Sequence, residues 1–224
     1  MTQRVAPLLN REDPDKEPLT GNVKVTREDW LNLARDVLVH DGVGELKILS
    51  LSNRLGVSRS SFYWYFKGRD DLLMALLDEW EARNTRTVSE YCQRPAADIS
   101  AAVCNFFRCF IDPLLFDQGL DFAVREWARR DKDLRARMDN ADSARLNAVA
   151  SMFRRYGYEE ADADARARIL YFMQLGYHAL EVREPMDLRM GRLPGFLKGF
   201  TGVDAAPDLL TEFAAYARSM EARL

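Results

Sequence analysis

Apolar residues recur at helical spacing along most of the chain, and this periodicity restricts the fold more than any other feature. In residues 30–38 they occupy positions i, i+3, i+4, i+7 and i+8, which form one face of an amphipathic helix. No segment shows the sustained two-residue alternation that is typical of a half-buried strand. The sequence therefore predicts an all-α fold without a sheet.

Capping and turn residues divide this pattern into helices. Thr26-Arg27-Glu28-Asp29 has the form of a capping box at which the first helix begins, and glycines at 42 and 44 end it. Ser58 is a candidate cap for a short helix that runs to about residue 65. The other predicted helices cover about 48–55, a long stretch from about residue 70, and 97–116, 120–130, 132–156, 161–182 and 208–223. Residues 183–207 hold four Gly and three Pro, and we expect a loop there with one short helix around 196–200.

Composition narrows the function classes. The 224 residues are 47% hydrophobic and 30% charged with a net charge of -3, so the chain can bury a core without metals or disulfides. We expect Cys92, Cys104 and Cys109 to be buried and inert, because only His40 and His178 could join them in a metal site. No motif of a nucleophilic, nucleotide-dependent or zinc enzyme is present, so we predict no catalytic residue, no metal and no cofactor.

The sequence also indicates where the protein works. No apolar run approaches the roughly 18–20 residues that span a bilayer, and residues 1–24 lack the apolar core of a signal peptide. We therefore expect a cytoplasmic protein without membrane contact. Residues 1–24 are rich in charge and proline, which predicts a flexible N-terminal arm, either without a role or reaching a partner.

One segment is basic although the chain is acidic. Residues 46–69 contain five Lys or Arg and no Asp or Glu, a pattern suited to a polyanion that touches one end of the molecule. The order of short helix, Gly-Val-Ser turn and short helix fits a helix-turn-helix, whose second helix enters the major groove. Helical periodicity turns Arg59, Ser60, Tyr63 and Trp64 toward the groove. A basic, solvated helix pair with no partner is the alternative, as is an interaction protein that has lost DNA binding.

The residue types in this segment are more specific evidence of function than the spacing of its helices. The stretch L-S-N-R-L-G-V-S-R-S-S-F-Y-W-Y-F-K-G-R-D-D-L-L, residues 51–73, resembles the DNA-binding motif of TetR-family transcriptional regulators. The resemblance covers about residues 26–80, and beyond residue 95 it extends only to the helical architecture. It implies a ligand-responsive regulator, more often a repressor than an activator, that binds a palindromic operator in double-stranded DNA as a homodimer.

The resemblance also implies a division of the chain and a set of DNA contacts. Residues 25–70 would form the helix-turn-helix domain, and 71–224 a helical effector-binding and dimerisation domain that begins with a connecting helix at 71–92. Gly68-Arg69 replaces the commoner Ser-Lys of the family, and Trp64 is bulky for a groove-facing site, so the operator sequence is not predicted. The implied phosphate or base contacts are Thr26, Lys47, Ser58, Arg59, Ser60, Tyr63, Trp64, Tyr65, Lys67 and Arg69.

The predicted helix at 161–182 is apolar on two faces. One stripe includes Ile169, Phe172 and Leu180, and the other includes Tyr171 and His178. A helix that is apolar on two faces must be buried on both, so a second subunit is expected to pack against one of them. A central helix in a monomeric bundle is the alternative. This helix and 208–223 match the family's dimerising pair in order.

An effector pocket is the least determined feature. Its residues could equally be ordinary core, and His178 could equally lie in the subunit interface. We expect the charged run at 125–135 to be a solvated face, although one Arg turned inward would select an acidic effector. The candidate lining consists of Phe106, Phe110, Trp127, Met138, Phe153, Phe172 and Tyr177, with Gln174 and His178 as polar groups for an unknown small molecule.

Overall fold

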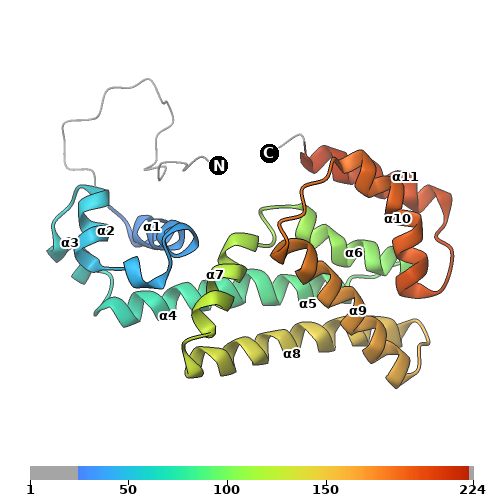
Figure 1. The fold of residues 1–224 in the computed structure, drawn as a ribbon, viewed down its shortest axis with the longest axis horizontal. Coiled ribbons are helices and arrows are strands. Elements are labelled where there is room, and N and C mark those ends of the chain that lie inside the picture. Colours follow the sequence, from blue (N-terminus) through green and yellow to red (C-terminus); the bar gives the residue numbers. More distant parts are fainter. Residues whose placement is uncertain (1–24, 222–224) are drawn as a thin grey trace.

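The computed structural model describes residues 25–221, and this part of the chain is helical and contains no β-strand (Figure 1). The predicted all-α fold is therefore confirmed. The predicted N-terminal arm lies outside the described residues. The helices are α1 Arg27–His40, α2 Ile48–Leu55, α3 Arg59–Tyr63, α4 Arg69–Trp80, α5 Arg86–Gln93, α6 Ile99–Ile111, α7 Gln118–Ala128, α8 Lys132–Arg155, α9 Glu160–Ala179, α10 Met186–Thr201 and α11 Pro207–Glu221.

Local chemistry fixes the ends of the first helices. The predicted capping box at Thr26 is present, since its side chain accepts from the backbone of Asp29 while the Asp29 carboxylate accepts from the Thr26 backbone. Gly56 ends α2 with a φ of 69°, a left-handed conformation that suits glycine. Ser58 does not cap α3 as predicted, because its hydroxyl is bonded to the Ser60 hydroxyl at 2.7 Å.

A continuous helical rod connects the two ends of the molecule. Helix α4 continues through a π-helical turn at Glu81–Thr85 into α5. The predicted long helix is therefore present, but one turn within it is π-helical instead of α-helical. Asn84 is fully buried in that turn, where its amide donates to the backbone carbonyl of Asp117 at 2.9 Å. The π turn thereby joins the rod to the start of α7.

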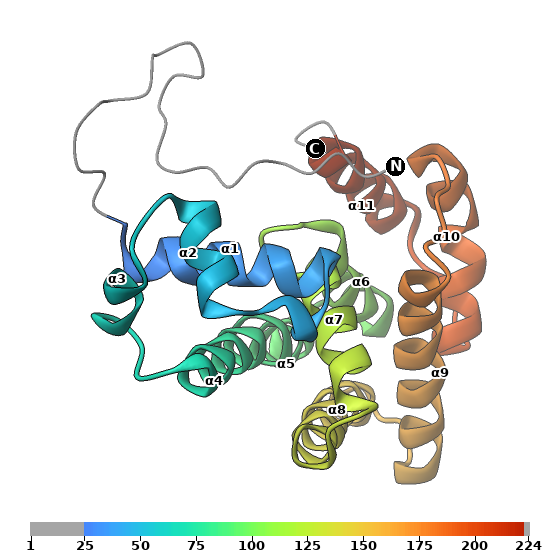
Figure 2. The same cartoon turned by 60° about the vertical axis from the view of Figure 1, so that its left-hand side comes forward.

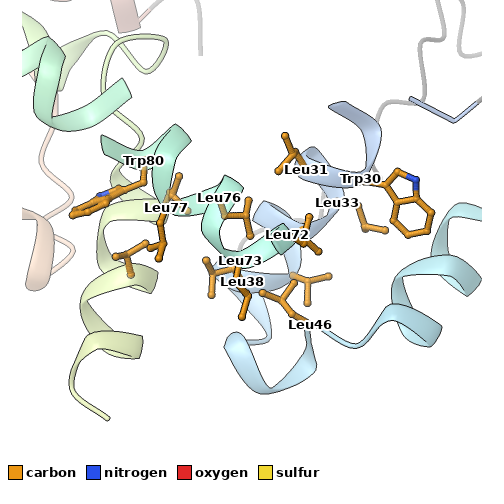
Figure 3. Close-up of a cluster of buried hydrophobic side chains, with 14 of the residues drawn as sticks. Trp30, Leu31, Leu33, Leu38, Leu46, Leu72, Leu73, Leu76, Leu77 and Trp80 are labelled. Atoms are coloured by element: carbon orange, nitrogen blue, oxygen red, sulfur yellow. The ribbon is translucent and has the colours of Figure 1, made fainter. Parts of the chain in front are cut away.

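The first hydrophobic cluster joins the N-terminal helices to the middle of the chain. Figure 3 shows buried side chains from α1 and α4 directed toward one another, among them Leu33, Leu38 and Leu72. Leu120 and Val124 of α7 belong to the same cluster. Apolar packing is therefore continuous across residue 70, the predicted end of the helix-turn-helix domain.

The second hydrophobic cluster lies among α5, α6 and α8–α11, and the views in Figures 1 and 2 both place α9 beside α10. The three cysteines are buried as predicted, two of them in this cluster. Burial raises the pKa of the Cys92 and Cys104 thiols to about 12, so both are protonated at neutral pH.

Helix α10 corrects the prediction of a loop at 183–207. It has 16 residues, and Leu193, Leu197 and Phe200 fall on one helical face that is buried against the second cluster. Pro194 lies inside the helix and removes one backbone donor. Burial of these three apolar side chains stabilises the helix by more than the local cost of proline and glycine.

Candidate nucleic-acid interface and ligand cleft

The short helix α3 is held by aromatic packing on its inner face. The Phe62 ring is fully buried and meets the Trp30 ring of α1 edge to face at a centroid distance of 5.2 Å. Phe66 packs on the other side of Phe62 at 5.3 Å. These contacts fix the orientation of α3 on α1, so the outer face of α3 is held in one direction.

The outer face of α3 carries the side chains that the sequence assigned to the groove. Arg59 and Ser60 are exposed, and Tyr63 and Trp64 are 58% and 85% exposed. Large aromatic side chains are seldom left this open without a partner. A cation, a hydroxyl and two aromatic side chains are therefore displayed together along α3 and at its C-terminal end.

Exposed lysines flank this face. The Lys47 ammonium lies 3.1 Å from the Glu45 carboxylate, in an exposed pair that contributes at most ~1 kcal/mol and can be exchanged for a phosphate. Lys67 is exposed, and its ammonium makes no ion pair with any residue in 25–221. Both ammonium groups are therefore open to solvent, and their role at the DNA backbone stays a prediction.

Three predicted contact residues are used inside the protein instead. The Tyr65 hydroxyl donates to the Val25 carbonyl at 2.8 Å, so its proton is not available to a phosphate. The Arg69 guanidinium donates to the carbonyls of Val43 and Leu46, each at 2.7 Å, and joins the start of α4 to the turn before α2. The Thr26 hydroxyl donates to Asp29 within the capping box. The resemblance implied DNA contacts for Thr26 and Tyr65, and helical periodicity placed Arg69 near phosphates, but neither could show these internal acceptors.

Comparison with known proteins identifies this segment. Residues 31–76 match the model for bacterial regulatory proteins of the tetR family. A stretch of 57 residues is 32% identical to TtgW, an uncharacterized HTH-type transcriptional regulator of Pseudomonas putida. Residues 31–76 therefore carry a TetR-type DNA-binding segment. The aligned stretch covers 25% of this chain and 42% of TtgW, so the relationship to TtgW is confined to a part of each protein.

The fold beyond this segment also has a TetR-type counterpart. The crystal structure of a transcriptional regulator described as a TetR/AcrR family member covers 89% of this chain and 99% of its own, with a TM-score of 0.54 and 16% identity. At this identity the likeness shows the fold alone. Among residues 25–221, no helix has both the length and the hydrophobicity to cross a membrane.

A buried ionic network lies among α4, α7, α8 and α9. Asp121 of α7 and Arg145 of α8 are fully buried, with 2.9 Å between Asp121 Oδ1 and Arg145 Nη2. The Trp80 indole donates to the same carboxylate at 2.8 Å. Burial alone would raise the pKa of Asp121, but Arg145 and Arg125 lower it to about 2.

Arg125 extends the network and corrects a sequence prediction. Its guanidinium donates to Asp142 of α8 at 2.6 and 2.8 Å and to Asp121 at 2.9 Å. Tyr171 of α9 donates to Asp142 at 2.7 Å. Arg125 is therefore turned inward, not solvated, and its charge is neutralised by carboxylates, so it is not free to select an acidic effector.

The structure brings only some of the predicted effector residues together. Phe110, Gln174 and Tyr177 line a small cavity of about 50 Å³ among α6, α9, α10 and α11. Phe110, Tyr177 and His178 also line a larger cleft of about 540 Å³ that reaches the end of α1.

The other predicted lining residues lie elsewhere. Trp127 and Met138 belong to the first cluster, because α7 and the start of α8 turn them toward α4. Phe106 and Phe153 are fully buried as ordinary core, and Phe172 is half exposed on the outside of α9. None of these five residues lines the small cavity or the larger cleft.

His178 lines the cleft, and its hydrogen-bond partner Gln174 lines the small cavity. Its ring is 5.4 Å from Phe110 and 6.0 Å from Phe116, centroid to centroid, and it is 9% exposed. Gln174 Nε2 lies 2.8 Å from His178 Nε2, whereas His178 Nδ1 has no hydrogen-bond partner among residues 25–221. Burial lowers the pKa of His178 to about 4, so the ring is neutral at pH 7.

Arg189 is one of several cleft residues that the sequence analysis did not predict, with Val39 and Phe122 among the others. Arg189 lies in the first turn of α10, inside the stretch predicted as a loop, and lines both the small cavity and the cleft. The available signal was a helical period of buried Leu193, Leu197 and Phe200 after it, which proline and glycine obscured.

Helix α9 has one buried and one exposed apolar stripe. Tyr171, Gln174 and His178 face the interior, whereas Ile169 and Phe172 are 57% and 50% exposed and Leu180 is more exposed still. The sequence predicted two apolar faces, and the single chain covers one of them.

Proposed function

We propose that this chain is a DNA-binding transcriptional regulator of the TetR family. The observation that carries the proposal is the outer face of α3, where Arg59, Ser60, Tyr63 and Trp64 are exposed beside Lys47 and other basic groups. The inner face of the same helix is fixed by Phe62. A rigid helix with a polar and cationic outer face suits reading of base edges in the major groove.

The proposed contacts divide into two kinds. Arg59, Ser60 and Tyr63 read bases, and Trp64 packs against the groove wall or the sugar edge. Lys47 and Lys67 contact phosphates, which positions the protein without specifying sequence. Ser58, next to Ser60, is the remaining candidate, while Thr26, Tyr65 and Arg69 act by holding the helices in place.

The regulator is proposed to act as a homodimer on a palindromic operator. The exposed stripe of Ile169, Phe172 and Leu180 on α9 supports this, because a contiguous apolar face is costly in water and a two-fold axis would bury it against its copy. Two recognition helices related by that axis require two inverted half-sites about one or more DNA turns apart.

The regulator is further proposed to be a cytoplasmic repressor released by a small ligand. The support is the cleft of about 540 Å³, which is lined by α1 of the DNA-reading unit as well as by α7, α9 and α10. A ligand there contacts both units, so it can favour one placement of α1 over another and thereby shift the spacing of the two reading heads.

Selection of bound duplexes from a random DNA library by the full purified chain, at two salt concentrations, tests the proposed function. We expect an enriched palindrome at both concentrations, with its half-site spacing set by the dimer. If DNA is bound only at low salt and no sequence is enriched, the basic helix pair binds DNA only by nonspecific charge attraction, and the proposal is contradicted.

A further inference from the structure

The cleft between α1 and the C-terminal helices has the size and lining of a small-molecule site. Its volume is about 540 Å³, within the range of ~300–1,000 Å³ that is usual for ligand pockets. Its walls include Val39 of α1, Phe122 of α7 and Tyr177 of α9. The adjoining cavity of about 50 Å³ shares Phe110, Tyr177 and Arg189 with the cleft, so the apolar surface continues inward.

Charge in the cleft is compensated except at one side chain. His40 lies 3.1 Å from Asp36, and Glu181 lies 3.2 Å from Arg183. Arg189, which is half-buried, makes no ion pair or side-chain hydrogen bond with residues 25–221, and its guanidinium carbon lies 6.0 Å from the centroid of the Tyr177 ring. A half-buried guanidinium that has no carboxylate partner, beside an apolar surface, is able to bind an anionic group.

A second donor lies at the floor of the cleft. The Gln174 amide nitrogen can only donate, so His178 Nε2 accepts from it at 2.8 Å and the proton of the neutral ring lies on Nδ1. That Nδ1–H has no acceptor among the described residues, on a side chain that is nine-tenths buried. A buried donor without an acceptor is costly, and an acceptor supplied by a ligand would remove the cost.

We propose that the cleft binds an apolar organic acid, with the carboxylate on Arg189 and the hydrocarbon or aromatic body against Phe110, Phe122 and Tyr177. This inference rests on the proposed function in one respect, namely that the protein responds to a small ligand. Arg189 selects the charge and His178 supplies the neutral donor. Neutral or cationic molecules of the same shape leave the guanidinium unpaired and bind more weakly.

Matched acid and amide pairs test the ligand class. The probes are 3-phenylpropionate, 2-naphthoate and decanoate, each beside its primary amide, with the full chain in thermal-shift and calorimetric titrations. We expect at least one acid to bind, and every acid that binds to do so about tenfold or more tightly than its amide, the scale of one charge-assisted contact. Equal binding of acid and amide, or binding by none of the three acids, would overturn the proposal.

Two variants locate the acid. Arg189→Gln should reduce the affinity for the acid to that for its amide, with the circular dichroism and unliganded Tm of the wild type. Arg183→Gln is the matched control, because it removes the same charge from the same cleft but at an exposed position already paired with Glu181. If Arg189→Gln keeps the preference for acids, or if Arg183→Gln removes it, Arg189 is not the anion site.

DNA binding measured on the same samples separates this inference from the proposed function. Acids that bind through Arg189 without changing DNA affinity would support the site and contradict ligand regulation. A selected duplex that binds while no acid does would leave the DNA-binding function standing and overturn the inference.

Discussion

Arg145 is a charged residue that is fully buried because a carboxylate on another helix pairs with it. It occupies an apolar register on α8, seven residues after Met138 and four before Val149, and it is as buried as they are. Its charge is matched by Asp121 at 2.9 Å, and its guanidinium lies 5.3 Å from the Trp80 ring. The sequence analysis predicted neither the burial of this charged residue nor its partner on α7.

His178 gives the stability of the protein a pH dependence. The pKa is lowered by burial to about 4 in the folded chain, against 6.5 for an unperturbed histidine. As the pH falls from 6.5 to 4, the unfolded chain gains a proton that the folded chain does not, so the free energy of unfolding decreases, by up to ~3 kcal/mol from this group. Below about pH 4 both states are protonated and the loss from this group ends.

Denaturant unfolding of the wild type and of His178→Gln at several pH values between 4 and 7 measures this term. Carboxylates titrate near the lower end of the range in both proteins, so the quantity of interest is the difference between their free energies of unfolding. We expect that difference to move in favour of the variant as the pH decreases through the window. Parallel pH profiles would show that burial does not hold the ring neutral.

At the level of elements, α10 is a helix that local sequence signals did not predict. Proline and four glycines in 183–207 indicate a loop by intrinsic preference, yet the segment from Met186 to Thr201 is helical. The stabilising contacts come from distant elements, since Leu197 and Phe200 pack in the cluster that contains α6 and α9. By contrast, α1 was predictable because its capping box and apolar stripe lie within its own sequence.

The exposed stripe of α9 should be a subunit interface. Phe172→Glu places a charge in the centre of the stripe, and burying that charge in an apolar interface costs several kcal/mol, so the dimer should dissociate at micromolar concentration while each chain stays helical. Sedimentation equilibrium, with circular dichroism as the folding control, measures both.

A matched variant, Arg135→Glu, changes charge on a different helix, α8, at an exposed position paired with Asp139, and it should leave the association constant nearly unchanged. A monomeric wild type, or a Phe172→Glu chain that dimerises as tightly as the wild type, would show that this stripe does not join two subunits.

For the whole molecule, the sequence was most informative at the DNA-reading end. The exposed positions of Arg59, Tyr63 and Trp64 followed from helical periodicity alone, because one side of α3 must bury Phe62. The ligand cleft was only half predicted: Phe110, Tyr177 and His178 line it, but Trp127 does not, and Arg189 came from a helix that was not anticipated. Contacts between residues 70 or more positions apart in the chain depend on tertiary packing, and no local sequence pattern predicts them.

DNA reading by α3, with flanking lysines on the phosphate backbone, is the property on which the proposed regulator depends. Equilibrium binding of the wild type, Tyr63→Ala and Lys67→Ala to the selected duplex and to a scrambled duplex, over a range of salt, tests this property, with Lys198→Ala of α10 as the control. We predict that Tyr63→Ala loses ~1–3 kcal/mol on the selected duplex only, and that Lys67→Ala weakens both and lowers the salt slope by about 1. Wild-type affinity and selectivity in a folded, dimeric Tyr63→Ala chain would contradict this role of α3.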